Sequence, residues 1–211
     1  YHVPWSPGKT SDDKTIDTMD HFIGKKVVIT EKMDGENTSI YPDGYCHARS
    51  INSGYHESRS YIVAKAAEKI STIQTFINHK GLIFCGENLY AKHSIKYNNL
   101  EDYFYLFGVW EIDPSAAQET YLSWDVIEFY AKQLDFPSVR VLYEGTYDEL
   151  LVKALSNTLE ENQEGFVLRL YDSFSLMNWQ KSIVKFVRAN HVQTDTHWMH
   201  KKIEKNGLKG A

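Results

Sequence analysis

The sequence predicts an α+β fold in which largely antiparallel sheets are flanked by helices. Strand-like apolar segments come in runs, and the helical segments between them follow no regular β-α-β alternation. Pro42-Asp43-Gly44 is a hairpin signal that joins two of the strand-like segments. The length of 211 residues suits one large domain or two small ones. We expect one domain, with an irregular segment at 1–24, a core at 25–190 and a helical tail at 191–211.

The expected strands are short apolar segments bounded by turn residues. They lie at residues 25–31, 37–41, 44–49, 82–89, 103–112, 139–143, 165–171 and 182–188. The expected helices lie at residues 59–79, 123–134, 146–159 and 195–206, with one short helical piece inside 1–24. Gly81 and Gly207 follow two of these helices as stops, and Ser123 is a capping residue for the second.

Composition restricts the class of protein. Hydrophobic residues make up 42% and charged residues 24% of the chain, as in ordinary globular domains. No apolar run approaches the ~20 residues of a membrane span, and no signal peptide pattern opens the sequence. Cys46 and Cys85 lack C-x-x-C spacing and lie in strand-like runs, so we expect reduced core residues. These features lead us to expect a cytoplasmic monomer in a reducing compartment, with no membrane partner.

The segment Glu31-Lys32-Met33-Asp34-Gly35-Glu36-Asn37 lies between two strand-like runs. Asp34-Gly35 predicts an exposed bend, because glycine accepts backbone angles that a Cβ forbids. Lys32 therefore lies at a strand end among carboxylates and an amide. A lysine amine is a nucleophile when it is partly deprotonated, but the three fixed letters of K-x-D-G also suit a polar hairpin tip.

Other charged residues recur at the ends of apolar strands. Arg49 closes the third strand, Glu87 closes the fourth, Glu164 opens the strand at 165–171, and Lys185 lies in the last strand. Each alone is typical of a solvated strand end. Brought onto one surface, they suit nucleotidyl transfer, in which cations neutralise phosphate charge and carboxylates hold a metal or a ribose.

In this order the segments resemble the motifs of the covalent nucleotidyltransferases, which are the polynucleotide ligases and mRNA capping enzymes. The closest resemblance is to ATP-dependent RNA ligases of the group typified by phage T4 RNA ligase 2. The motifs are I at 31–37, an arginine motif at Arg49, III at 84–87, IIIa at 105–109, IV at 164–169 and V at 183–186. The resemblance implies an adenylyltransferase (nucleotidyltransferase) domain.

The resemblance also implies a catalytic mechanism. Lys32 would attack the α-phosphate of ATP, expel pyrophosphate and form a covalent lysyl-AMP. Glu164 would bind a catalytic metal through water or position Lys32, and Asn37 would orient water on that metal. Mg²⁺ or Mn²⁺ is the implied cofactor, since Mg²⁺ prefers carboxylate and phosphate oxygens and keeps several waters.

The other implied cofactor-binding residues are Glu31, Met33, Arg49, Glu87, Phe107 and Lys185. Glu31 would lie beside adenine, and Phe107 would stack on its face. Arg49 and Glu87 would hold ribose and phosphate, and Lys185 would contact the α-phosphate. The implied partners are nicked or broken RNA ends, whose 3′-hydroxyl and 5′-phosphate would be joined through an AMP-capped 5′ end. The contacts to the 3′-hydroxyl strand are expected among residues 45–60 and 181–202.

Three departures from the family pattern stand out. Motif V often has a second lysine two residues from the first, whereas Ile183 and Val187 flank Lys185. Arg188 or Lys181 could substitute for it, or one phosphate contact could be missing. Gly108 replaces the usual acid after the aromatic of motif IIIa, so the stack could shift from Phe107 to Tyr105. The chain also ends soon after motif V, so a C-terminal domain often appended in the family is absent or was removed.

Two other readings stay open. The chain could be a GTP-using capping-type guanylyltransferase or a DNA ligase. It could instead be a catalytically idle nucleotide- or RNA-binding module that kept the fold. The presence of Lys32, Glu87, Glu164 and Lys185 together favours an active enzyme.

Overall fold

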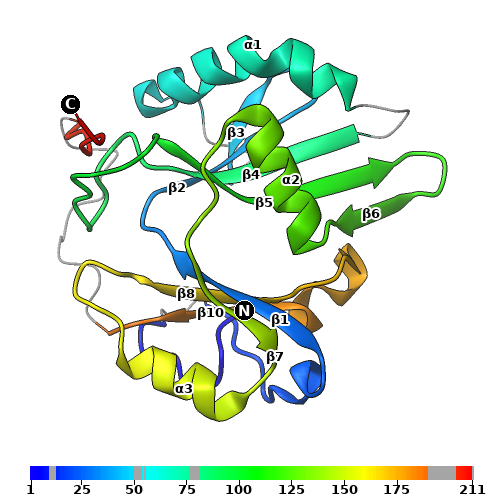
Figure 1. Cartoon of the computed structure of the whole chain (residues 1–211), viewed down its shortest axis with the longest axis vertical. Coiled ribbons are helices and arrows are strands. Elements are labelled where there is room, and N and C mark those ends of the chain that lie inside the picture. Colours follow the sequence, from blue (N-terminus) through cyan, green and yellow to red (C-terminus); the bar gives the residue numbers. More distant parts are fainter. Residues whose placement is uncertain (10–12, 50–53, 55, 77–80, 190–202, 211) are drawn as a thin grey trace.

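The computed structural model describes residues 1–9, 13–49, 54, 56–76, 81–189 and 203–210. Two sheets face one another, and the chain passes between them at the bend after β1 (Figure 1). The four-stranded sheet has the order β10 (Ile183–Val187), β8 (Gly165–Leu170), β1 (Lys26–Lys32), β7 (Val141–Thr146). The six-stranded sheet has the order β3 (Cys46–Ala48), β2 (Glu36–Ile40), β4 (Gly81–Asn88), β5 (Phe104–Asp113), β6 (Gln118–Tyr121), β9 (Phe174–Ser175).

Helices cover the outer faces of the two sheets. The helices α1 (Ser60–Thr75) and α2 (Trp124–Leu134) lie over the six-stranded sheet, and α3 (Glu149–Asn157) lies under the four-stranded one (Figure 1). Short 3₁₀ helices are η1 (Asp20–Phe22), η2 (Glu57–Arg59) and η3 (Leu176–Lys181). Every ladder between the named strands is antiparallel, so the predicted α+β class with antiparallel sheets is confirmed.

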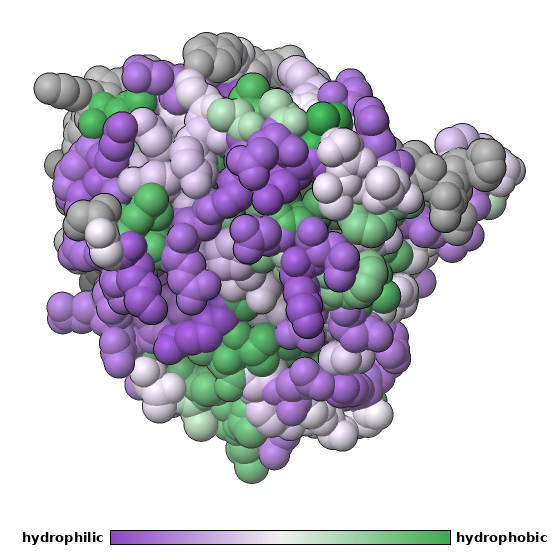
Figure 2. All heavy atoms as spheres, turned by 45° about the horizontal axis from the view of Figure 1, so that its top comes forward, coloured by the Kyte–Doolittle hydropathy of each residue, from purple (hydrophilic) through white to green (hydrophobic). Residues whose placement is uncertain are grey.

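Each sheet has its own hydrophobic core. One cluster, which includes Ile40, Phe84 and Trp124, lies between the six-stranded sheet and α1 and α2. The other, which includes Phe166 and Val152, lies between the four-stranded sheet, α3 and the N-terminal segment. On the face that Figure 2 shows, hydrophilic side chains predominate and hydrophobic ones gather in smaller groups. No helix of the described residues is long and apolar enough to cross a membrane.

The N-terminal segment extends the four-stranded sheet beyond β10. His2 bridges to Lys185, Val3 N–H donates to the Lys185 carbonyl at 2.9 Å, and Gly8 N–H donates to the Val187 carbonyl at 2.9 Å. In the described residues of the predicted irregular segment, 1–9 and 13–24, η1 is a short helical piece. The pairing with β10 could not be predicted, because it joins residues at opposite ends of the chain.

Most predicted elements are present, with shifted ends. The predicted helix at 59–79 begins with η2, and α1 ends at Thr75; residues 77–80 lie outside the described part. The predicted strand at 139–143 is instead Val141–Thr146. The helix predicted from 146 begins at Glu149, because the carboxylate of Asp148 accepts from the N–H groups of Leu150 and Leu151. The strands β6 and β9 were not predicted.

The helix predicted at 195–206 can be compared with the structure only at residues 203–206, because residues 195–202 lie outside the described part. For residues 203–206 the prediction is wrong. Residues 203–206 form no helix, and Lys205 forms an isolated bridge with Ala91. The side chain of Asn206 accepts from Tyr97 N–H at 3.0 Å and donates to the Leu89 carbonyl at 2.8 Å. Both of its ends satisfy backbone groups of another segment, and this outweighs helix propensity.

Candidate active site

The bend between β1 and β2 is anchored on both sides. Gly35 N–H donates to Oε1 of Glu87 at 3.0 Å, and a Cβ on Gly35 would lie 2.5 Å from the Asn88 carbonyl oxygen. The carboxylate of Asp34 accepts from the N–H groups of Ser94 and Ile95, each at 2.7 Å. Asp34 is therefore buried, and the prediction of an exposed bend is wrong. Asp34 and Gly35 fix the position of the strand end that carries Lys32.

Lys32 lies among acidic groups at this strand end. Its Nζ is 2.5 Å from Oε2 of Glu164, and the two side chains are 25% and 8% exposed. Register places Lys32 opposite Gly165, so Glu164 reaches it from the start of β8. Burial lowers the pKa of Lys32, but the charges of Glu164 and Glu87 and the hydrogen bond to Glu164 raise it more. Its pKa therefore lies above the ordinary 10.5, and the amine is protonated near neutral pH.

Glu87 is the second acid of this cluster. Burial raises the pKa of Glu87 to about 8, against the lowering effects of Lys32 and of the Gly35 N–H group; Glu164 and Asp34 add to the rise. A cation brought into the cluster would offset the negative charge that faces Lys32 from Glu164 and lower the pKa of Lys32. The donors are hard oxygens, which fits a divalent cation such as Mg²⁺. Within the described residues no three His, Cys, Asp or Glu side chains form a metal site, so such a cation would rely on water and phosphate ligands.

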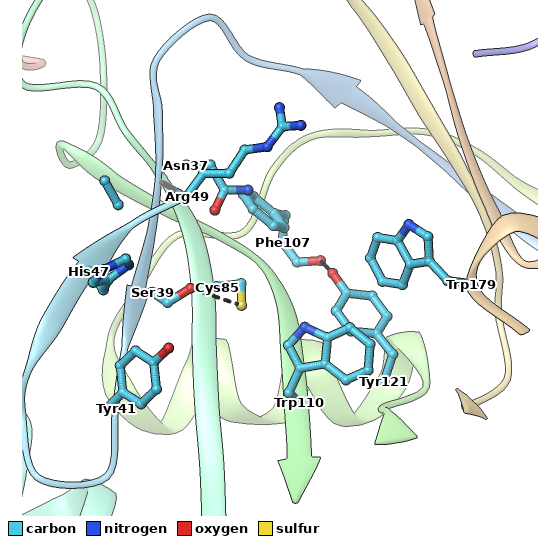
Figure 3. A pocket seen from close by; sticks show the side chains of 11 residues that line it. Asn37, Ser39, Tyr41, His47, Arg49, Cys85, Phe107, Trp110, Tyr121 and Trp179 are labelled. Atoms are coloured by element: carbon cyan, nitrogen blue, oxygen red, sulfur yellow. Dashed lines mark hydrogen bonds between the residues drawn. The ribbon is translucent and has the colours of Figure 1, made fainter. Parts of the chain in front are cut away.

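Asn37, Arg49 and Phe107 line one hollow of about 550 Å³, here called the Arg49 hollow (Figure 3). It lies on the face of the six-stranded sheet opposite α1 and α2, and its other lining residues are Ser39, Tyr41, His47, Ala48, Cys85, Trp110, Tyr121 and Trp179. Asn37 pairs with Glu87 across β2 and β4. The hollow therefore lies next to the acidic cluster around Lys32.

Glu31 and Met33 line a different hollow of about 700 Å³, here called the Arg140 hollow. Tyr105 lines it too, and Oε2 of Glu31 accepts from Nε of Arg140 at 3.0 Å. Strand alternation explains the division, because Glu31 and Met33 point away from the side of Lys32. The structure therefore separates the predicted nucleotide-binding residues into two hollows, with Lys32, Glu87 and Glu164 as a third group.

Lys185 pairs with Val167 on β8, two residues from Gly165, which pairs with Lys32. Its Nζ is 3.0 Å from Oδ1 of Asp13, a residue that sequence reasoning did not identify as a partner. Asp13 also lies 3.2 Å from Nε2 of buried His2, so the N-terminal segment supplies acidic charge to the basic strand β10. No local pattern in residues 1–24 indicated this contact.

Val187 is one of the two positions, with Ile183, at which the family's second lysine would lie, and it is apolar and covered. Val187 pairs with Gly165, whose other neighbour is Lys32, and Val187 is 2% exposed. A Cβ on Gly8 would lie 2.7 Å from a methyl group of Val187, which shows how closely the N-terminal segment seals it. Arg188 donates to the carbonyls of Gln163, Ala189 and Glu161, so it holds the loop before Glu164. Lys181 is exposed at the end of η3.

The replacement of the motif IIIa acid by Gly108 also has a structural reason. A Cβ on Gly108 would lie 1.7 Å from the hydroxyl oxygen of Tyr121, so the tyrosine occupies the room that a side chain would need. The Tyr121 hydroxyl donates to the Phe107 carbonyl at 3.3 Å, and the Arg169 guanidinium lies 4.6 Å from the Tyr121 ring centroid.

The aromatic wall of the Arg49 hollow was missed by sequence reasoning. Trp110 stacks on Trp179 with ring centroids 5.4 Å apart (Figure 3). Alternation counted from Phe107 would place Val109, not Trp110, on this face. A bulge leaves Phe107 without a partner between Leu106 and Gly108, and it reverses the alternation. Only the position of the bulge, which the sequence does not show, brings Phe107 and Trp110 into one hollow.

The sequence model of the RNA ligase family matches residues 25–187. The chain belongs to the RNA ligase family. The matched range includes every motif on which the resemblance rested, so that prediction is confirmed at the level of the family. No curated protein matches the chain.

Solved RNA ligases share the fold of this RNA ligase-family chain. A Naegleria gruberi RNA ligase variant with ATP and Mn has a TM-score of 0.55 and 21% identity, over 81% of this chain and 52% of its own. The Naegleria gruberi RNA ligase with PPi has a TM-score of 0.55 and 22% identity, over 81% of this chain and 51% of its own. The chain thus spans about half the length of these structures, and the likeness concerns the fold alone.

Proposed function

We propose that this RNA ligase-family chain is an ATP-dependent RNA ligase that acts through a lysyl-AMP on Lys32. The observation that carries the proposal is the cluster of Lys32, Glu164 and Glu87 beside the Arg49 hollow. Nζ of Lys32 would form a bond to the α-phosphorus of ATP as the bond to the bridging oxygen of pyrophosphate breaks. AMP would then pass to an RNA 5′-phosphate, and an RNA 3′-hydroxyl would displace it.

The charge state of the cluster fits the first step. Lys32 must lose a proton to attack, and its raised pKa shows that the acidic cluster alone keeps it protonated. A Mg²⁺ or Mn²⁺ ion held through water by Glu164 and Asn37 would supply positive charge that neutralises phosphate and carboxylate oxygens. Glu164 lies 2.5 Å from the amine and is placed to accept its proton. Alignment and charge neutralisation are the main requirements of phosphoryl transfer.

The two hollows suit the rest of the nucleotide. Arg49 would hold phosphate or ribose, Glu87 the ribose hydroxyls, and Phe107 the face of the base. Glu31 and Met33 lie in the Arg140 hollow, so a base that contacts them and Phe107 must lie between the two hollows. The residues Tyr105 and Phe107, two positions apart on β5, line one hollow each. Lys185 would exchange its ion pair with Asp13 for the α-phosphate.

We also infer that the chain works as a single nucleotidyltransferase domain, as a monomer, in a reducing compartment such as the cytoplasm. The supporting observation for the compartment is that Cys46 and Cys85 are buried free thiols. Burial raises the pKa of each thiol to about 11, which makes both unreactive.

The function is tested by mixing the protein with Mg²⁺ and either ATP or GTP and recording its intact mass. We expect one AMP with ATP and no adduct with GTP. A GMP adduct would instead indicate a capping-type guanylyltransferase, and no adduct with either nucleotide would indicate an idle binding module. Pre-adenylylated nicks that differ only in the last two sugars on the 3′-hydroxyl side then test the acceptor. Sealing is expected to need ribose there, and equal sealing with deoxyribose would contradict the RNA assignment.

A further inference from the structure

Cross-strand pairs of side chains lie on the face of the β2–β3 hairpin that borders the Arg49 hollow. Ser39 pairs with His47 in the ladder, Arg49 N–H donates to the Asn37 carbonyl at 3.1 Å, and Tyr41 N–H donates to the Tyr45 carbonyl at 2.8 Å. Because side chains two residues apart share a face, three pairs form one track. From the Lys32 end outward they are Asn37 with Arg49, Ser39 with His47, and Tyr41 with Tyr45.

The outer part of this track is aromatic and held rigidly. The ring centroids of Tyr41 and Tyr45 are 6.1 Å apart, and those of Tyr45 and His47 are 6.1 Å apart. The turn that carries them is fixed by Gly44, which has φ +83° and donates to the Tyr41 carbonyl at 2.9 Å. The Asp43 carboxylate accepts from Tyr45 N–H at 2.9 Å. The Tyr45 side chain is nevertheless 60% exposed, so its ring is available to a ligand.

The track leads from this ring to the candidate active site. Tyr41 and His47 line the Arg49 hollow (Figure 3). Tyr45 is not one of its lining residues. At the inner end, Arg49 is exposed and Asn37 pairs with Glu87, the neighbour of Lys32. Asn37 and Tyr41 are four positions apart along the chain, which is about 13 Å in an extended strand. A ligand on the track would present its bases to the tyrosines, and its inner end would lie beside Asn37 and Arg49, next to the proposed nucleotide.

On the basis of the proposed function, we propose that this track binds the 3′-hydroxyl strand of single-stranded RNA, with a base stacked on Tyr45. Aromatic rings stack on any base, and the exposed Tyr45 ring lies at the outer end of the track, away from the residues assigned to the nucleotide. The opposite wall is less suited to this, because Trp110 and Trp179 already stack on each other. A strand that lies on the track with its 3′ end inward would bring that end toward Lys32, where the AMP-capped 5′ end must meet it.

The test compares three variants in which an exposed ring is changed. Tyr45→Leu removes the ring and Tyr45→Phe keeps it. Phe129→Leu is the matched control, because Phe129 is 52% exposed and lies on α2, on the other side of the sheet. Fluorescence anisotropy of a labelled 3′-hydroxyl oligoribonucleotide at one salt concentration measures binding. Sealing of that strand to a pre-adenylylated 5′ strand gives its KM, and AMP adduct formation from ATP measures the nucleotide step.

We expect Tyr45→Leu to weaken RNA binding and raise the KM roughly five- to a hundredfold, the range for loss of one base–aromatic stack. Tyr45→Phe and Phe129→Leu should remain close to the wild-type protein, and adduct formation should be unchanged in all three. Unchanged RNA binding in Tyr45→Leu would overturn the proposal, as would a loss confined to adduct formation. If the wild-type protein forms no adduct, the proposed function fails, while the anisotropy comparison still decides whether the track binds RNA.

Discussion

At the scale of single residues, the acidic neighbours of Lys32 raise its pKa above the ordinary value. Glu164 and Glu87 together outweigh the effect of burial and raise the pKa of Lys32. The sequence allowed Lys32, Glu87 and Glu164 to be chosen, because each lies at the end of a recognisable strand. It could not show the direction of the pKa shift, since that depends on distances between side chains from β1, β4 and the start of β8. The sequence also could not explain Val187 and Gly108. Contacts in the structure explain them, because Gly8 packs against Val187 and the Tyr121 ring fills the space beside Gly108.

The raised pKa of Glu87 makes stability depend on pH. Between pH 4.5 and about 8 the folded protein keeps a proton on Glu87 that the unfolded chain has lost. The folded state therefore binds more protons, and the free energy of unfolding falls as pH rises through this window. Glu87→Gln cannot ionise and still offers an oxygen to Gly35 N–H. Its stability relative to the wild-type protein should rise, by on the order of a few kcal/mol, between the lower and upper ends of the window.

Urea unfolding at several pH values across this window checks the prediction. Glu119→Gln is the control, because Glu119 is an exposed residue of β6. Parallel stability curves for Glu87→Gln and the wild-type protein would show that Glu87 ionises normally in the fold.

At the scale of elements, β8 organises the four-stranded sheet, because it pairs with both β1 and β10. Its apolar run was predictable from sequence, as were the runs of β1, β4 and β5. The strands β6 and β9 were not predictable, because one is polar at three of its four positions and the other has two residues. Helix propensity failed at 203–206 for a different reason, since Asn206 is held by partners in the loop after β4.

Gly165 lies on β8 between Lys32 and Val187, and a Cβ there would lie 1.9 Å from the Phe186 carbonyl oxygen. Gly165→Ala should therefore force β8 and β10 apart and destabilise the protein by on the order of 3 kcal/mol or more. Gly81→Ala is the matched control in β4, where the nearest atom would be 3.8 Å away. Thermal unfolding of both variants tests this, and an equal effect of the two substitutions would contradict the packing described.

At the scale of the whole molecule, the site is assembled from both sheets and both ends of the chain. The N-terminal segment pairs with β10 and brings Asp13 to Lys185, and Asn206 holds the loop whose Ser94 and Ile95 bind Asp34. The order of motifs along the sequence was sufficient to predict the family and the fold class. It was not sufficient to assign each residue to a hollow. Strand alternation and the bulge in β5 place Glu31 and Met33 in one hollow and Asn37, Arg49 and Phe107 in the other.

The central claim, a covalent AMP on Lys32, is tested most directly by locating the adduct. The protein is incubated with ATP and Mg²⁺, digested without exposure to acid, and analysed by peptide mass spectrometry. We predict one AMP on the peptide that contains Lys32, and none in a Lys32→Ala variant whose circular dichroism spectrum matches that of the wild-type protein. An adduct that persists in Lys32→Ala, or that maps to Lys185 in the wild-type protein, would contradict the assignment of Lys32 as the nucleophile.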